Sequence, residues 1–182
     1  QLGADDERDL FPQALRLVEE IQPKAVMLEN VKGLATARFN HYRTQITDRL
    51  EEFGYEWDWQ VLNSSEMGVP QLRPRFILVA LRPDAYEHFE WPNAQKTPPT
   101  VGKTLKTLMG ANGWAGLDEW VKTADGIAPT LVGGSRKHGG PDLGPTRARA
   151  AWLQLGVDGR SIAAAAPSAT DPVNLTPKLT LQ

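Results

Sequence analysis

The chain has 182 residues, with 41% hydrophobic and 23% charged residues and a formal net charge of −2. These values are typical of a globular protein, and they exclude a polybasic, histone-like binder while leaving room for a local basic patch. Without cysteine and with only three histidines, the chain has no disulfide and no thiolate nucleophile, and we expect no metal site. No apolar run is long enough to cross a membrane and no leader pattern opens the chain, so we expect a cytoplasmic protein with no membrane partner.

The first third of the chain predicts a helix, a strand and a second helix. Apolar residues recur at helical spacing over residues 11–21, with Asp9 as the N-cap. Residues 25–28 predict a short buried strand. A second helical stripe covers residues 41–53 and is closed by Gly54 at the C-cap.

Two further strands follow, and then the composition changes. Residues 55–62 alternate between apolar and polar side chains, which predicts a half-buried strand, and the continuous apolar run 76–81 predicts a strand buried on both faces. Helices and strands in this order are typical of an α/β sheet covered by helices. Residues 92–100 form a Pro-rich break, so we expect a domain over 1–91, a linker over 92–100 and a second region over 101–182.

Glu29 is the first candidate functional residue. It stands at the end of a predicted strand, where functional side chains collect in open α/β sheets. A carboxyl group there could protonate a ring nitrogen if its surroundings favoured the neutral form. The structural alternative is a carboxylate that caps the next segment or pairs with a neighbouring basic group.

Arg73 and Arg75 form the second candidate group, because they stand one residue apart at the entrance of the last buried strand. In a strand they would point to the same side, as would Gln71. Arg75 can offer a planar fork of donors to a base carbonyl, and Arg73 can reach a carboxylate or a phosphate. The alternative is a solvated strand end.

Three motifs in this order resemble the DNA (cytosine-5)-methyltransferase family: the capped helix with Leu10-Phe11, the run Glu29-Asn30-Val31, and the pattern QxRxR over 71–75. The resemblance covers residues 5 to 82 closely and extends more weakly to the stretch "GIAPTLVGG". It implies a partial Rossmann-like methyltransferase sheet in the first domain. For residues 101–182 it implies a smaller, irregular, mainly β/loop target-recognition domain.

The resemblance also implies a role for each candidate residue. In the family, a cysteine thiolate adds to C6 of a flipped-out cytosine, and S-adenosylmethionine donates the methyl group to C5. Glu29 matches the proton donor to N3 of that ring, and Arg75 matches the arginine that holds O2. Arg73 matches its companion, and Leu10 falls where the family lines part of the cofactor pocket, although a role in the core is an equally good interpretation of a leucine.

The glycine-rich stretch after residue 126 is the candidate contact with double-stranded DNA. The resemblance implies a backbone contact for Thr130, and the following loop offers free amides, a hydroxyl and basic side chains to phosphates and base edges. That loop supplies the candidate residues Gly133, Gly134, Ser135, Arg136 and Lys137. The distribution of charge supports this interpretation. Residues 122–160 hold six Lys and Arg against three Asp, whereas residues 1–60 hold seven Lys and Arg against twelve Asp and Glu. A surface loop whose glycines serve only turns is the alternative.

The match lacks the family's cysteine nucleophile and its main cofactor motif. We therefore expect a fragment of a prokaryotic DNA (cytosine-5)-methyltransferase of a restriction-modification system, inactive by itself and completed by a missing N-terminal segment or a complementary chain. Two alternatives remain: a non-catalytic DNA-binding module, and a relative that methylates tRNA. The long region after residue 92 favours DNA, because a tRNA enzyme needs no reader of duplex sequence.

Overall fold

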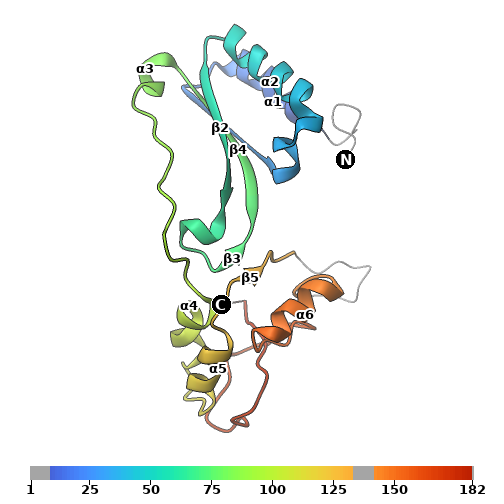
Figure 1. Ribbon diagram of the computed structural model, residues 1–182, viewed down its shortest axis with the longest axis vertical. Coiled ribbons are helices and arrows are strands. Elements are labelled where there is room, and N and C mark those ends of the chain that lie inside the picture. The colour runs from blue at the N-terminus through green and yellow to red at the C-terminus, as the bar shows by residue number, and fades with distance from the viewer. Residues whose placement is uncertain (1–8, 133–141, 182) are drawn as a thin grey trace. The chain divides into compact units, whose positions relative to one another are not determined.

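The computed structural model describes residues 9–132 and 142–181 and shows a mixed α/β protein with small sheets (Figure 1). The chain divides into two compact units. The first unit comprises residues 1–62 and 74–93, and the second comprises residues 63–73 and 94–182. Residues 63–73, which the sequence analysis placed in the first domain, thus belong to the second unit.

Two helices form one layer of the first unit. They are α1 (Phe11–Ile21) and α2 (Asn40–Glu52), close to the bounds expected from their apolar spacing. The Asp9 carboxylate accepts a hydrogen bond from the Phe11 amide at 3.0 Å, so it satisfies a free donor of the first turn from just outside the helix. Gly54 follows α2 with φ +81°, a left-handed conformation that favours glycine.

The sheet of the first unit has three strands in the order β1, β4, β2. These are β1 (Ala25–Val31), β2 (Glu56–Asn63) and β4 (Pro74–Leu81). β1 and β4 pair antiparallel, with Glu29 opposite Ile77 and Val31 opposite Arg75. Shorter elements of the described chain are α3 (Pro83–Tyr86) and 3-10 turns over Lys32–Ala35, Ala37–Phe39 and Ser64–Met67.

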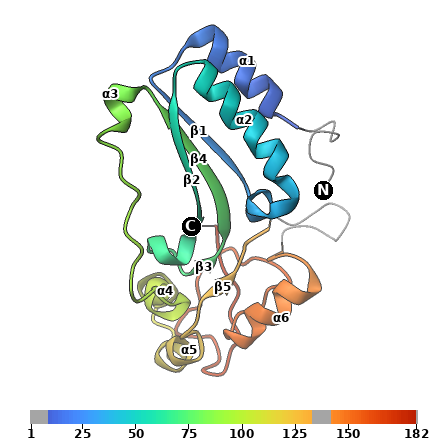
Figure 2. The same ribbon diagram turned by 45° about the horizontal axis from the view of Figure 1, so that its top comes forward.

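Both helices cover the same face of this sheet (Figure 2). Most buried residues of this core come from α1, α2, β1 and β4, among them Val18, Val26, Leu50, Phe76 and Leu78. On the other face Met27 is 72% exposed and Val31 is 48% exposed. The expectations of a buried strand at 25–28 and of a strand buried on both faces at 76–81 are therefore wrong, because α1 and α2 cover one face only.

The second unit contains three helices and a minimal sheet. The helices are α4 (Val101–Met109), α5 (Leu117–Thr123) and α6 (Thr146–Gln154), and β3 (Gln71–Leu72) pairs parallel with β5 (Ala128–Pro129). The β part of the expected irregular, mainly β/loop region is wrong, because the described residues after 101 hold three helices and only the two-residue strand β5, whereas most of the others are irregular as expected. Short helices form because three tryptophans, Trp114, Trp120 and Trp152, provide a core against which they pack. The many glycines between the helices hid this pattern in the sequence.

Candidate active site

The candidate active site begins with an ion pair on the open face of the first unit. Glu29 projects to that face because successive side chains of β1 alternate, and its neighbours Leu28 and Asn30 are less exposed. Its Oε1 lies 2.5 Å from Nε of Arg75 on the neighbouring strand. The Glu29 side chain is 50% exposed and that of Arg75 is 23% exposed, so the pair is open to a ligand.

Arg75 keeps donors available while it holds Glu29. Its Nη1 donates to the carbonyl oxygen of Pro74 at 2.9 Å, and its Nε contacts Oε1 of Glu29. A guanidinium carries five N–H groups, and Nη2 has no hydrogen-bond partner among the described residues. The pair can therefore offer a carboxyl group and a separate guanidinium fork from the same face of the sheet.

Arg73 is placed differently from the sequence expectation. It lies between β3 and β4 rather than in a strand, so the rule that alternate strand residues share a side does not apply to it. Its backbone amide donates to Oδ1 of Asn63 at 3.0 Å, and its carbonyl oxygen accepts from the amide of Ser64 at 3.3 Å. Arg73 belongs to the second unit and Arg75 to the first.

Thr130 lies next to the arginine motif within the second unit. The parallel pairing of β3 with β5 sets Leu72 opposite Pro129, and the hydroxyl of Thr130 donates to the carbonyl oxygen of Leu72 at 2.6 Å. The two stretches are 58 residues apart in the chain. The segment before Arg73 and the segment that ends in Thr130 are thus joined.

Leu10 flanks the first turn of α1 and is 74% exposed. The alternative interpretation of this residue as part of the core is therefore wrong. The neighbouring Asp9 is fixed by the hydroxyl of Tyr42, and burial together with this carboxylate raises the pKa of Tyr42. The candidate DNA-binding residues 133–137 lie outside the described residues.

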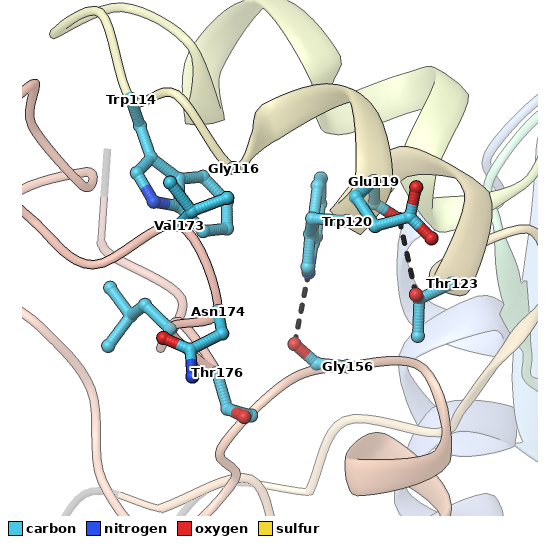
Figure 3. A pocket seen from close by; sticks show the side chains of 10 residues that line it. Trp114, Gly116, Glu119, Trp120, Thr123, Gly156, Val173, Asn174 and Thr176 are labelled. Atoms are coloured by element: carbon cyan, nitrogen blue, oxygen red, sulfur yellow. Dashed lines mark hydrogen bonds between the residues drawn. The ribbon is translucent and has the colours of Figure 1, made fainter.

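A hollow of about 180 Å³ lies in the second unit, and none of the candidate residues is among those that line it (Figure 3). Trp114, Trp120 and Glu119 are among its lining residues, and both rings are at least 96% buried. Each indole N–H is already used: that of Trp120 donates to the carbonyl of Gly156 at 3.0 Å, and that of Trp114 to Pro172 at 2.9 Å. We therefore interpret this hollow as part of the packing of the second core.

The described chain shows neither a metal-binding cluster nor a membrane-spanning helix. Residues 9–132 and 142–181 contain no group of three or more His, Cys, Asp or Glu placed to hold a metal ion. Over the same described ranges, no helix is long and apolar enough to cross a membrane.

The model of the C-5 cytosine-specific DNA methylase family matches residues 1–137. The chain belongs to this family. The type II methyltransferase M.NaeI of Lentzea aerocolonigenes is 54% identical over all 182 residues, which span 44% of that protein. The type II methyltransferase M.NgoMIV of Neisseria gonorrhoeae is 49% identical over 72% of this chain and 43% of its own length.

Among solved structures, the crystal structure of a Spodoptera frugiperda DNMT2 mutant is similar over 54% of this chain and 33% of its own. The TM-score is 0.44 at 22% sequence identity. The chain thus spans less than half the length of these relatives, including the two methyltransferases above.

The structure brings together some of the candidate residues of this family member. Glu29 contacts Arg75 within the first unit, and Thr130 contacts the chain directly before Arg73 within the second. Sequence reasoning missed Asn63, whose side chain fixes the backbone of Arg73. It also missed the pairing of β3 with β5. Strands of two residues carry no periodic pattern, so only the turn-forming residues around them could have pointed to this contact.

Proposed function

We propose that this chain is the part of a DNA (cytosine-5)-methyltransferase that binds and protonates the target cytosine and recognises the surrounding duplex. The observation that carries the proposal is the solvent-open Glu29–Arg75 pair, which lies within the residues matched by the family model and in the motifs that resemble the family. In the complete enzyme the reaction transfers a methyl group to C5 of a cytosine flipped out of the double helix. The first unit would then be part of a Rossmann-like methyltransferase sheet.

The chemistry asks two things of this chain. When a thiolate adds to C6 of cytosine, electron density moves through the ring toward N3 and C5. A proton given by the Glu29 carboxyl to N3 lowers the cost of this addition, and Arg75 can hold the ring by donating hydrogen bonds to O2. Arg73 would organise the adjacent phosphate. The ion pair with Arg75 orients the carboxylate before the base arrives. The carboxylate would first take up a proton from solvent, which the half-exposed side chain allows, and would then give that proton to N3.

S-adenosylmethionine would supply the methyl group. The described residues of this chain offer one fitting contact, the exposed side chain of Leu10 at the start of α1. An exposed leucine can cover an apolar part of a cofactor, and Asp9 and Tyr42 fix the backbone beside it. Other contacts to the cofactor would come from outside these 182 residues.

The chain by itself should not methylate DNA, because none of its 182 residues is a cysteine. The thiolate has to come from a segment or a partner chain that the 182 residues do not include. The 44% coverage of M.NaeI supports this view. The names of the two bacterial relatives, both type II methyltransferases, support a role beside a restriction enzyme in the cytoplasm of a prokaryote.

The second unit would carry DNA recognition. Thr130 would contact the backbone near the flipped base, and Gly133, Gly134, Ser135, Arg136 and Lys137 would follow the phosphates and base edges. The whole second unit has 11 Lys and Arg against 7 Asp and Glu, which supports contact with a polyanion.

The decisive experiment is a chimera in which this chain replaces the matching 44% of M.NaeI. We expect the chimera to transfer labelled methyl groups to duplex DNA, and Glu29→Gln to slow that transfer by about 10²- to 10⁴-fold because the general acid is lost. The matched control is Glu19→Gln, since Glu19 is also half exposed and paired with an arginine, Arg49, at 3.2 Å. We expect no change from it.

Four outcomes would contradict the proposal in different ways. Full activity of the Glu29→Gln chimera would remove the catalytic role of Glu29. Methyl transfer by the pure 182-residue chain would show that the chain needs no external thiolate. A chimera that binds DNA but never methylates it would favour the non-catalytic DNA-binding module, and methylation of tRNA alone would favour the tRNA-methylating relative.

A further inference from the structure

One helix of the second unit, α6, has an exposed outer face without acidic side chains. α6 is anchored by Trp152, which is 3% exposed in the second core. The opposite side of the helix is open to solvent, and its residues recur at positions i, i+1, i+4, i+7 and i+8. This outer face of α6 consists of Thr146, Arg147, Ala150, Leu153 and Gln154.

The outer face carries hydrogen-bonding groups that the protein itself does not use. α6 contains no acidic residue, and the Arg147 guanidinium has no hydrogen bond or ion pair with any described residue. The nearby Arg149 behaves differently, because it lies 3.3 Å from the buried carboxylate of Asp142. Among the described residues, nothing therefore occupies the five donors of Arg147.

The contacts of α6 place the start of the helix beside residues 130–132. α6 packs against β5, which Thr130 directly follows, and Figures 1 and 2 show α5 and α6 on either side of β5. Gly144, just before the helix, lies so close to Val132 that a Cβ added to it would be 2.6 Å from that side chain. The start of α6 is thus held against residues 130–132.

We propose that α6 enters the major groove of duplex DNA and reads base edges with Arg147 and Gln154. This inference rests on the proposed function. The major groove admits an α-helix, arginine pairs with guanine, glutamine pairs with adenine, and a small central residue such as Ala150 lets the helix approach closely. The net positive charge of the second unit complements the phosphates that flank the groove.

The test uses the intact 182-residue chain and a pool of duplexes with a randomised core, at one fixed salt concentration. We expect the chain to enrich one motif. Arg147→Ala should lower the preference at one base pair by about 5- to 150-fold while binding to non-specific duplex changes little. Arg16→Ala, which removes the same charge from an exposed position of α1 in the first unit, is the matched control and should leave the motif unchanged.

A second pair of variants tests contact rather than base reading. Ala150→Glu places a negative charge at the centre of the outer face and should weaken binding to every duplex more than tenfold. Gln13→Glu, on the exposed side of α1, adds the same charge and should not. Circular dichroism should show that both variants fold, because both positions are exposed.

The outcomes separate this inference from the proposed function. If Arg147→Ala enriches the same motif with the same strength, or Ala150→Glu binds normally, α6 faces a protein or solvent and the inference is wrong, while methylation by the chimera is unaffected. If the unaltered chain enriches no motif, the inference is also wrong, and the chimera alone then decides the proposed function.

Discussion

The two units of this chain differ in charge and in the way their cores are built. The first unit has 9 Lys and Arg against 15 Asp and Glu, whereas the second has 11 against 7. The first builds its core from two regular helices over one face of a sheet, and the second packs short helices around three tryptophans.

Under the proposed function, this difference would separate catalysis from DNA recognition. The acidic unit carries Glu29 on an open sheet face, where Arg75 holds it. The basic unit carries Thr130 and α6, and its net positive charge would be attracted to phosphates. We expect substitutions to act on one unit at a time, and the following predictions test that expectation.

The largest expected effect on stability comes from the first core. Phe76 is 1% exposed and stacks on Trp59, with ring centroids 5.0 Å apart. Phe76→Ala should lower the free energy of unfolding of the first unit by about 3–5 kcal/mol, because it removes buried area and leaves a cavity. Hydrogen exchange should become faster in β1 and β4 and stay unchanged in α4 and α5.

The next residue along β4 provides the control. Ile77 points to the open face and is only partly buried, so Ile77→Ala should cost much less. Equal losses from the two variants would mean that the open face is covered in solution. Faster exchange throughout both units would mean that they unfold together.

A glycine contact should produce the next largest effect, in the second unit. A Cβ added to Gly102 of α4 would lie 2.4 Å from the backbone oxygen of Val121 in α5. Gly102→Ala should therefore force the two helices apart and cost about 1–3 kcal/mol, although alanine favours a helix intrinsically. Thermal unfolding would measure this loss of stability, and hydrogen exchange would show whether it is confined to α4 and α5.

Gly159→Ala is the matched control, because its Cβ would meet its nearest atoms at 3.4 Å, an ordinary contact distance. We expect little change from it. If Gly102→Ala instead stabilises the protein, as helix propensity alone predicts, the close approach of α4 to α5 is wrong.

The difference between the two units also explains which elements could be predicted from the sequence. In the first unit, residues 11–21 and 41–53 have clear helical periods and 55–62 has a clear strand period, and the structure has elements there. The open face of β1 and β4 could not be predicted, because an apolar run does not reveal whether the chain itself supplies both covering layers. In the second unit, α5 and α6 are too short and too close to glycines to give a strong period.

The sequence also predicted a part of the candidate site. The motif positions led to Glu29 and Arg75, which the structure places in contact. The structural alternative, a carboxylate held by a basic neighbour, predicts the same ion pair, and the Glu29→Gln chimera distinguishes the two interpretations. Arg73 was misplaced because Pro74 begins β4 and leaves that arginine outside the strand. The contact between Thr130 and Leu72 depends on long-range pairing that no local pattern encodes.

The smallest predicted effect concerns an acidic residue of the basic unit. Asp158 accepts hydrogen bonds from the side chain and the amide of Arg160, at 2.9 and 3.1 Å, and these interactions lower its pKa to about 2. Since this pKa is depressed on folding, the stabilisation is present above the unfolded pKa of about 4 and is lost as the pH falls through about 2.

Asp158→Asn should therefore lower the free energy of unfolding by about 1 kcal/mol at neutral pH. The loss is this small because the partner, Arg160, is largely exposed. Urea titrations should show that the loss vanishes near pH 2. Asp118→Asn, which breaks an exposed pair with Lys106, should cost less. A loss for Asp158→Asn that stays constant down to pH 2 would mean that its carboxylate charge does not hold the turn.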